Sequence, residues 1–224
     1  MASKQPPASR RRFPLPGGRR GILLGLLGVA VVGLAVLLAA WFSACAGNAC
    51  PSLAGLDDYD PAQASKVYAA DGRLITDLGL ERRTVVPLTQ MSPAVVRAFL
   101  ATEDKRFYQH GGIDWVRVGG ALKGALGGRP TGASTITMQL AGNLFPEDIN
   151  RRQRTIGRKL REMRVAQQIE AKFSKDKILE MYLNQIDLGN RAYGVEVAAQ
   201  RYFGKSSGEL NFAESATLAA IWST

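Results

Sequence analysis

A continuous apolar run near the N terminus constrains this chain more than any other feature. Residues 21–42 read GILLGLLGVAVVGLAVLLAAWF and contain no charged side chain. A helix rises 1.5 Å per residue, so about 20 apolar residues cross the hydrocarbon core of a bilayer. The run therefore predicts one transmembrane helix over residues 21–43.

The charges before this run predict its orientation. Residues 1–20 contain no acid and carry six cations: Lys4, Arg10, Arg11, Arg12, Arg19 and Arg20. Basic flanks stay on the cytoplasmic side, so we expect a basic cytoplasmic tail over 1–20 and an extracytoplasmic chain beyond the helix. A cleavable signal peptide is the alternative, although its apolar core is usually only about 7 to 15 residues long.

Two cysteines, Cys45 and Cys50, are the only ones in the chain. In an oxidising compartment they can close a small disulfide loop, and Cys45 also weakly resembles a lipid-modified cysteine. Two thiols and a single histidine make a zinc site improbable. They lie in an expected linker over 44–65.

Residues 66–224 are expected to form one mainly helical domain with a small β-hairpin region at its start. Asp71-Gly72 between two β-rich runs predicts the hairpin, and residues 82–86 suggest another strand. Ser92-Pro93 is typical of a helix start. Helices are expected to 103 from this start and over about 134–144, 151–171, 175–185, 196–202 and 212–221. Six glycines predict a mobile loop over 119–132.

Glu103 is the first candidate for chemistry. The charged run Glu103–Arg106 can be a solvated helix end. Alternatively, the neighbouring aromatic and apolar residues enclose Glu103 and raise its proton affinity, as a general base requires; these neighbours are Phe99, Leu100, Phe107 and Tyr108. His110, the only histidine, is expected to orient other groups rather than transfer protons.

A cluster of short polar side chains follows the glycine-rich stretch: Ser134, Thr135, Thr137 and Gln139. Ser134 can cap a helix and Thr135 can bond the backbone locally. Together with helix-start N–H groups, the same side chains can also bind phosphate or sugar oxygens. The residues alone leave both interpretations open.

Glu162 is the second candidate. On a helix it shares a face with Arg158 and Lys159, either as an exposed ion pair or as a carboxylate beside a phosphate-binding surface. From Arg151 to Lys177 cations outnumber acids by ten to three. This excess predicts an anionic partner such as a pyrophosphate or lipid headgroup. Nucleic acid is not expected outside the membrane.

Five stretches, in this order, resemble the family 51 glycosyltransferase domain of class A penicillin-binding proteins and monofunctional peptidoglycan glycosyltransferases. They are residues 101–114 around Glu103-Asp104, 132–145 with GASTITMQL, 158–162, 177–184 and 193–205. The resemblance implies a lysozyme-like helical fold in a bacterial inner membrane protein with one membrane pass. It also implies lipid II and the growing glycan chain as substrates, and transpeptidases and other cell-wall synthesis proteins as partners.

The resemblance also implies a mechanism. Glu103 deprotonates the 4-hydroxyl of the acceptor sugar, which attacks the anomeric carbon of the growing chain with inversion and expels undecaprenyl pyrophosphate. Glu162 assists the leaving group, with Mg²⁺ or Mn²⁺ bound through the pyrophosphate. The implied substrate contacts are Asp104, Phe107, His110, Ser134, Thr135, Thr137, Gln139, Asn143, Arg158 and Lys159.

Two departures from the family pattern matter. Gly142 stands where a basic residue is common, which predicts lower activity unless Arg151, Arg152 or Arg154 supplies that cation; Met138, in place of a glutamine, is a variation that we expect to be tolerated. The chain ends where family members continue, which leaves open a monofunctional enzyme, a trimmed chain or a fragment of a longer one. The alternative functions are a membrane-bound muramidase and a non-catalytic module that binds lipid II or cell-wall enzymes.

Overall fold

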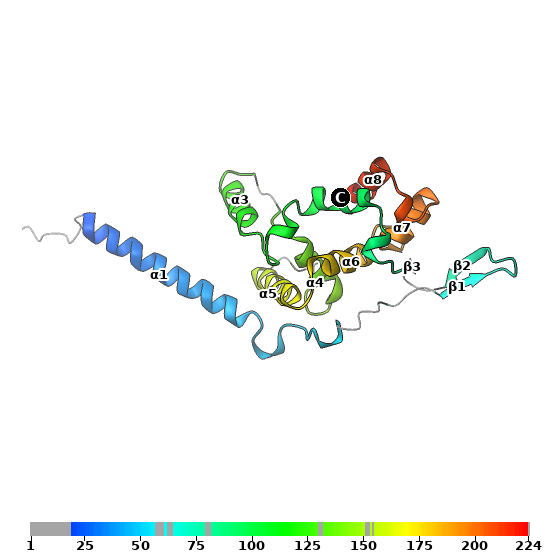
Figure 1. Ribbon diagram of the computed structural model, residues 1–224. Coiled ribbons are helices and arrows are strands. Elements are labelled where there is room, and N and C mark those ends of the chain that lie inside the picture. Colours follow the sequence, from blue (N-terminus) through cyan, green and yellow to red (C-terminus); the bar gives the residue numbers. More distant parts are fainter. Residues whose placement is uncertain are drawn as a thin grey trace, which may run out of the picture. The chain divides into compact units, whose positions relative to one another are not determined.

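The computed structural model describes residues 19–56, 61, 65–78, 82–129, 132–150, 153 and 155–223, and it is mainly helical (Figure 1). The chain divides into two compact units, with the boundary after Ser43. Each unit is considered by itself.

The N-terminal unit contains helix α1, Arg19–Ser43. Its stretch from Gly21 to Ser43 is long and apolar enough to cross a membrane, and none of it is buried within the protein. The predicted apolar helix is therefore confirmed.

The second unit begins with a covalent loop and a hairpin. Cys45 and Cys50 form a disulfide, which closes the small loop that the sequence allowed. Strands β1 (Ser65–Tyr68) and β2 (Leu74–Leu78) pair antiparallel around Asp71 and Gly72, where Gly72 adopts a φ of +82°. The Asp71 carboxylate accepts a hydrogen bond from the backbone N–H of Arg73 at 3.0 Å. The predicted hairpin is confirmed.

A second, smaller sheet corrects one prediction and contains a strand that the sequence did not indicate. β3 covers only Arg82–Arg83, so the strand expected over 82–86 is shorter. It pairs in parallel with β4, Ala192–Tyr193. Beyond Arg83 the chain pairs with a side chain instead of a strand. The Asn184 amide accepts from the Val86 N–H at 3.0 Å and donates to the Val86 carbonyl at 2.9 Å.

Seven helices are described in this second unit. They are α2 (Pro93–Glu103), α3 (Trp115–Leu126), α4 (Ile136–Leu144), α5 (Ile156–Lys172), α6 (Lys175–Gln185), α7 (Val195–Phe203) and α8 (Phe212–Ser223). Hydroxyl side chains that accept from backbone N–H groups fix the starts of α2, α4, α5 and α6: Ser92, Thr135, Thr155 and Ser174. The start of α4 is thus capped by Thr135 and not by Ser134, and α5 begins later than predicted.

Helix α3 replaces most of the mobile glycine loop that the sequence suggested, so that prediction is wrong. The Asp114 side chain caps α3 by accepting from the Arg117 N–H, and the helix stops at glycine, with Gly128 at a φ of +72°. No residue of α3 is buried. Its large apolar side chains face outward: Trp115, Val116, Leu122 and Leu126.

The core lies where α4 packs against α5 and α6, and α2 packs against α8. Figure 1 shows α4, α5 and α6 side by side in the centre of this unit. Residues Ile136–Gly142 of α4 are buried without exception. Because a buried helix must have every polar side chain bonded, α4 is the element around which polar groups of its neighbours gather.

Candidate active site

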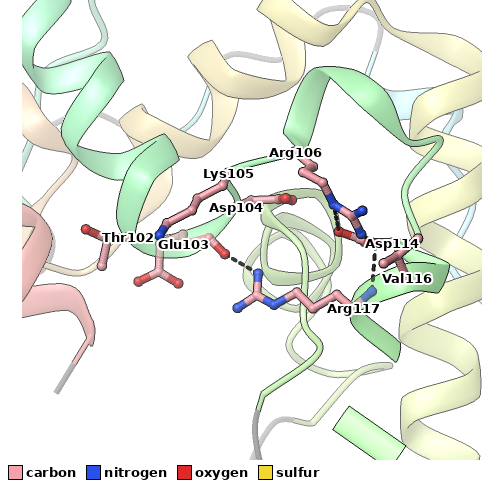
Figure 2. A pocket seen from close by; sticks show the side chains of 8 residues that line it. All are labelled: Thr102, Glu103, Asp104, Lys105, Arg106, Asp114, Val116 and Arg117. Atoms are coloured by element: carbon pink, nitrogen blue, oxygen red, sulfur yellow. Dashed lines mark hydrogen bonds and ion pairs between the residues drawn. The ribbon is translucent and has the colours of Figure 1, made fainter. Parts of the chain in front are cut away.

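Glu103 is the last residue of α2 and borders an open pocket of about 390 Å³ (Figure 2). The lining is mostly charged: Thr102, Glu103, Asp104, Lys105, Arg106, Asp114, Val116 and Arg117. The aromatic enclosure expected around Glu103 is wrong, because Phe99 and Phe107 belong to the hydrophobic core instead. A carboxylate at the open end of a helix can reach a solvent-borne substrate.

Two groups from distant parts of the chain hold Glu103. The Gln139 amide of α4 donates from Nε2 to Glu103 Oε2 at 2.7 Å. The Arg117 guanidinium donates to the main-chain carbonyl of Glu103, and its Nε donates to the Gly132 carbonyl at 3.1 Å. Figure 2 shows the Arg117 side chain extending from α3 toward Glu103. The candidate base is therefore fixed through both its side chain and its backbone.

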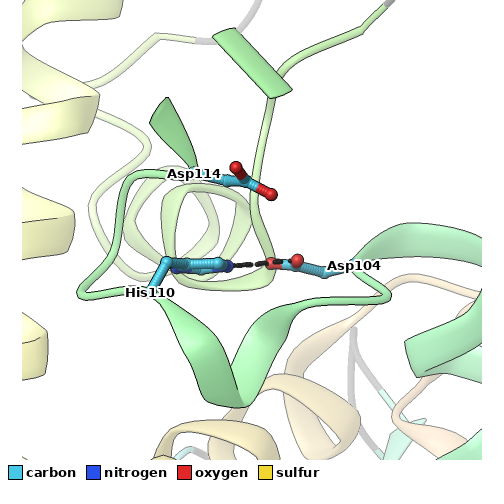
Figure 3. Close-up of side chains that lie close together, drawn as sticks. All are labelled: Asp104, His110 and Asp114. Atoms are coloured by element: carbon cyan, nitrogen blue, oxygen red, sulfur yellow. Dashed lines mark hydrogen bonds and ion pairs between the residues drawn. The ribbon is translucent and has the colours of Figure 1, made fainter. Parts of the chain in front are cut away.

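Asp104 lines the pocket and also bonds residues on both sides of the turn that follows Glu103. It is buried, and its two carboxylate oxygens lie 3.0 and 3.1 Å from His110 Nε2 (Figure 3). Its Oδ2 also accepts from the Ile136 N–H, at the first residue of α4. A negative charge is favourable at a helix N terminus. His110 is thus placed against the Asp104 carboxylate, and the orienting role expected for it stays a prediction.

Asp114 joins this cluster to α3. Arg106 forms an ion pair with its carboxylate, and the Arg117 N–H donates to Oδ1 at 2.9 Å. Burial tends to raise the pKa of Asp114, but the hydrogen bonds from Arg117 and Arg106 outweigh it and hold the pKa below its ordinary value. The ligand atoms of Asp104, His110 and Asp114 lie within 4.8 Å of one another. Because N–H donors and a guanidinium already occupy these carboxylates, they form a hydrogen-bonded cluster rather than a good cation site.

Most polar groups of the GASTITMQL stretch, residues 132–140, point into the protein. Thr135 Oγ1 donates to the Gly112 carbonyl at 2.6 Å, and Thr137 Oγ1 donates to Glu170 Oε1 at 2.5 Å. Both threonines are fully buried. Ser134, just before α4, is half-buried and accepts from Lys159 Nζ at 2.8 Å. Of these three hydroxyl side chains, only that of Ser134 lies near the protein surface.

Glu162 on α5 is buried, with 3% of its surface exposed, so the interpretation as an exposed ion pair is wrong. Its Oε2 lies 2.7 Å from Arg158 Nη1 and 3.3 Å from Lys159 Nζ. The same Lys159 ammonium reaches Ser134. The sequence-predicted groups of α5 are thus brought together with the start of α4.

This donor set does not suit Glu162 as a direct Mg²⁺ ligand. Two cations already share Oε2, and Mg²⁺ is usually bound by a few free carboxylates together with substrate phosphates. A metal ion held by a bound pyrophosphate stays a prediction.

The remaining predicted site residues lie deeper. Phe107 is buried, with the edges of Tyr108 and His110 against its ring at 5.2 and 6.3 Å between centroids and Lys175 Nζ 4.3 Å from its centroid. Asn143 is half-buried near the end of α4. Their roles as substrate contacts stay predictions. Arg151, Arg152 and Arg154, the residues considered as substitutes for the cation missing at Gly142, lie outside the described residues.

Sequence reasoning missed four residues of this site. Arg117 and Asp114 link α3 to Glu103, while Tyr182 and Trp222 each donate to Gln139 Oε1. Asp114 had a recognisable signal, since Asp is a common N-cap. The others act across long sequence separations, and no local pattern indicates them.

Comparison with known proteins agrees with the geometry. The transglycosylase family model matches residues 71–224. Penicillin-binding protein 1A of Aquifex aeolicus is 44% identical over 205 residues, which is 89% of this chain and 27% of that protein. The proteins of the same name from Escherichia coli and Haemophilus influenzae are 47% identical over 175 residues and 48% identical over 161 residues.

These two alignments cover 76% and 71% of this chain, and 20% and 18% of the respective relatives. The chain thus spans about a quarter or less of the length of the curated relatives it matches. The family match covers more than half of the chain and includes Glu103, α4 and Glu162. The chain therefore belongs to the transglycosylase family, the glycosyltransferase domain found in penicillin-binding proteins of class A.

Proposed function

We propose that this chain polymerises lipid II into glycan strands as a membrane-anchored peptidoglycan glycosyltransferase. One observation carries the proposal: the short helix α4 connects the two candidate carboxylates. Gln139 on α4 bonds Glu103 at 2.7 Å, and Ser134 just before α4 bonds the Lys159 that pairs with Glu162. A base in an open pocket is thereby coupled to a cationic cluster suited to a phosphate leaving group.

In this reaction Glu103 accepts the proton of the 4-hydroxyl on the acceptor sugar. The oxygen forms a bond to the anomeric carbon of the growing chain from the side opposite the leaving group, so the configuration inverts. The bond from that carbon to undecaprenyl pyrophosphate breaks at the same time. Arg158 and Lys159 balance the charge that develops on the departing pyrophosphate, and Glu162 holds these two cations in place.

A lipid-linked substrate agrees with the surface beside the pocket. Val116 and Arg117 line the pocket from α3, and this helix exposes Trp115, Leu122 and Leu126 to solvent. Large exposed apolar side chains on one helix are typical of a surface that meets lipid or another apolar partner. The proposed donor and acceptor each carry a lipid tail, which is an apolar partner for this surface.

We place the protein in a bacterial inner membrane, with a single pass, its N terminus in the cytoplasm and its catalytic domain outside. Helix α1 supports the single pass and the basic residues before it support the orientation. Mg²⁺ or Mn²⁺ would enter bound to the pyrophosphate and neutralise part of its charge. Transpeptidases and other cell-wall synthesis proteins are the proposed partners, because new glycan strands must be cross-linked.

The test is incubation of the detergent-solubilised chain with labelled lipid II and Mg²⁺, with polymer resolved from monomer on a gel. We expect polymer that moenomycin suppresses. Replacing a general base costs about 10²- to 10⁴-fold in rate, so Glu103→Gln should nearly abolish polymer while the protein stays folded. Glu162→Gln should also be severe, and the exposed Glu147→Gln is the matched control.

Other products would overturn the proposal in recognisable ways. Soluble sugars released from existing glycan would indicate a muramidase. Lipid II binding without turnover by the folded protein would indicate a non-catalytic module. Polymerisation by Glu103→Gln at the wild-type rate would refute the assignment of the base.

A further inference from the structure

The amide of Gln139 is held from both ends. Its Nε2 donates to Glu103 Oε2 at 2.7 Å. Its Oε1 accepts two hydrogen bonds, from the Tyr182 hydroxyl at 3.1 Å and from the Trp222 indole Nε1 at 2.9 Å. The four residues belong to four different helices, α4, α2, α6 and α8.

An amide side chain can rotate by half a turn and exchange its oxygen for its nitrogen with little change in shape. In the exchanged orientation the amide oxygen would face the Glu103 carboxylate, and neither group could donate. The indole N–H is only a donor, so it can bond the amide oxygen and not the NH₂ group. The orientation that satisfies Trp222 is thus the one that directs an N–H toward Glu103.

We propose that Trp222 and Tyr182 are positioning residues that lock the Gln139 amide so that it donates to the catalytic carboxylate: the donor-only indole of Trp222 selects this orientation, and the Tyr182 hydroxyl adds a second hydrogen bond to it. This inference rests on the proposed role of Glu103 as the base.

The donors themselves are well fixed. Tyr182 is fully buried, with the edge of its ring against Phe99 at 6.4 Å and against Trp222 at 6.3 Å between centroids. Trp222 also belongs to the partly buried shell around the core. Because both rings are held by packing, their hydrogen bonds cost little further ordering of side chains.

The lock can be tested against Gln139 itself. If Trp222 and Tyr182 act only by orienting the amide, their removal should matter only while that amide is present. In a Gln139→Met background, the same changes should therefore cause no further loss of rate. The charged groups that share the pocket remain unchanged in the variants below: Asp104, Lys105, Arg106, Asp114 and Arg117.

The first experiment compares Trp222→Phe, Tyr182→Phe and the double variant in the whole 224-residue chain, solubilised in detergent. Each single variant leaves one donor on Gln139 Oε1, so we expect kcat/KM to fall less than about threefold. The double variant leaves none, and we expect a loss of about tenfold or more, greater than the product of the single losses. The control is Tyr202→Phe. The hydroxyl that it removes donates to the Leu188 carbonyl, and Leu188 is far from Gln139 in the sequence.

A merely structural role would lower the rate by the same factor in the Gln139→Met background. Losses that multiply without excess, or an equal further loss in that background, would refute the lock.

A second experiment needs no activity. The chain has three tryptophans, so its ¹H–¹⁵N spectrum contains three indole signals, and Trp222→Phe identifies one of them. Gln139→Met removes the acceptor of the Trp222 indole, so that signal should shift while those of Trp41 and Trp115 stay in place. An unmoved Trp222 signal would refute the contact. If the Trp222 signal moves but the wild-type protein makes no polymer, the proposed function is refuted and the contact is still supported.

Discussion

Gly112 is the position where one methyl group should disturb the active site most. It lies in the buried turn between His110 and Asp114 and adopts a φ of +83°. A Cβ atom there would lie 3.0 Å from the carbonyl carbon and oxygen of Ala166 and 3.2 Å from the Gln167 nitrogen. These are backbone atoms of α5, which cannot rotate away as a flexible side chain would.

Two costs add in Gly112→Ala. A left-handed conformation costs an L-residue about 1–2 kcal/mol, and overpacking against a fixed neighbour costs about 1–3 kcal/mol. The free energy of unfolding should therefore fall by about 2–5 kcal/mol, which for a domain of this size lowers Tm by roughly 5–15 °C. The Gly112 carbonyl also accepts the Thr135 hydroxyl at 2.6 Å, so the strain should reach the start of α4.

The assay is thermal unfolding followed by circular dichroism, with polymerisation measured below Tm. Gly111→Ala is the matched control, since Gly111 has no positive φ and nothing lies within 4 Å of the place that its added methyl group would take. We expect its Tm to stay close to wild type. A Tm for Gly112→Ala within about 2 °C of the Gly111→Ala value would show that the turn does not pack against α5 as described.

Three further changes test the site. Arg117→Met removes the guanidinium that holds the Glu103 and Gly132 carbonyls, so kcat should fall about tenfold while Lys123→Met, on the same helix, retains activity. Ser134→Ala removes the acceptor of Lys159, so KM for lipid II should rise several-fold with a smaller change in kcat. The pKa of Asp114 lies below its ordinary 3.8, so its contribution to stability is complete above that value and is lost as pH falls through the lowered pKa. Asp114→Asn should therefore unfold at lower urea concentration at pH 7, and the difference should narrow as pH falls from about 4 to about 2.

Features that depend on neighbouring residues could be predicted from the sequence. Asp71-Gly72 specified the hairpin, and Ser92-Pro93 and Ser174 specified helix starts, because the groups that bond in each case lie within three residues. Helix α3 escaped the same reasoning. Each glycine costs a helix about 1 kcal/mol relative to alanine, but the Asp114 cap and the hydrogen bonds of Arg117 outside the helix stabilise its start. Strands β3 and β4 pair across more than 100 residues, and no local pattern reports such pairing.

The same division holds for the site. Glu103 and Glu162 could be found because each sits in a distinctive local motif, and Arg158 shares a helix face with Glu162. The groups that hold Glu103 could not be found in this way. Gln139 lies 36 residues away from it, and Trp222 lies 83 residues away from Gln139. Their meeting is decided by how four helices pack, which depends on the whole core.

The burial of α4 divides the polar residues of the GASTITMQL stretch, residues 132–140, into those bonded within the protein and those near its surface. A polar side chain on a buried helix must find a partner within the protein, and Thr135 and Thr137 do so through Gly112 and Glu170. Their hydroxyls are therefore committed to the fold, and substrate would have to break these bonds to use them. Ser134 lies near the protein surface beside Lys159, where its hydroxyl can position the ammonium for a phosphate oxygen of the proposed substrate. The stretch thus combines a rigid part, which holds Glu103 through Gln139, with a residue near the surface that can help to bind the proposed leaving group.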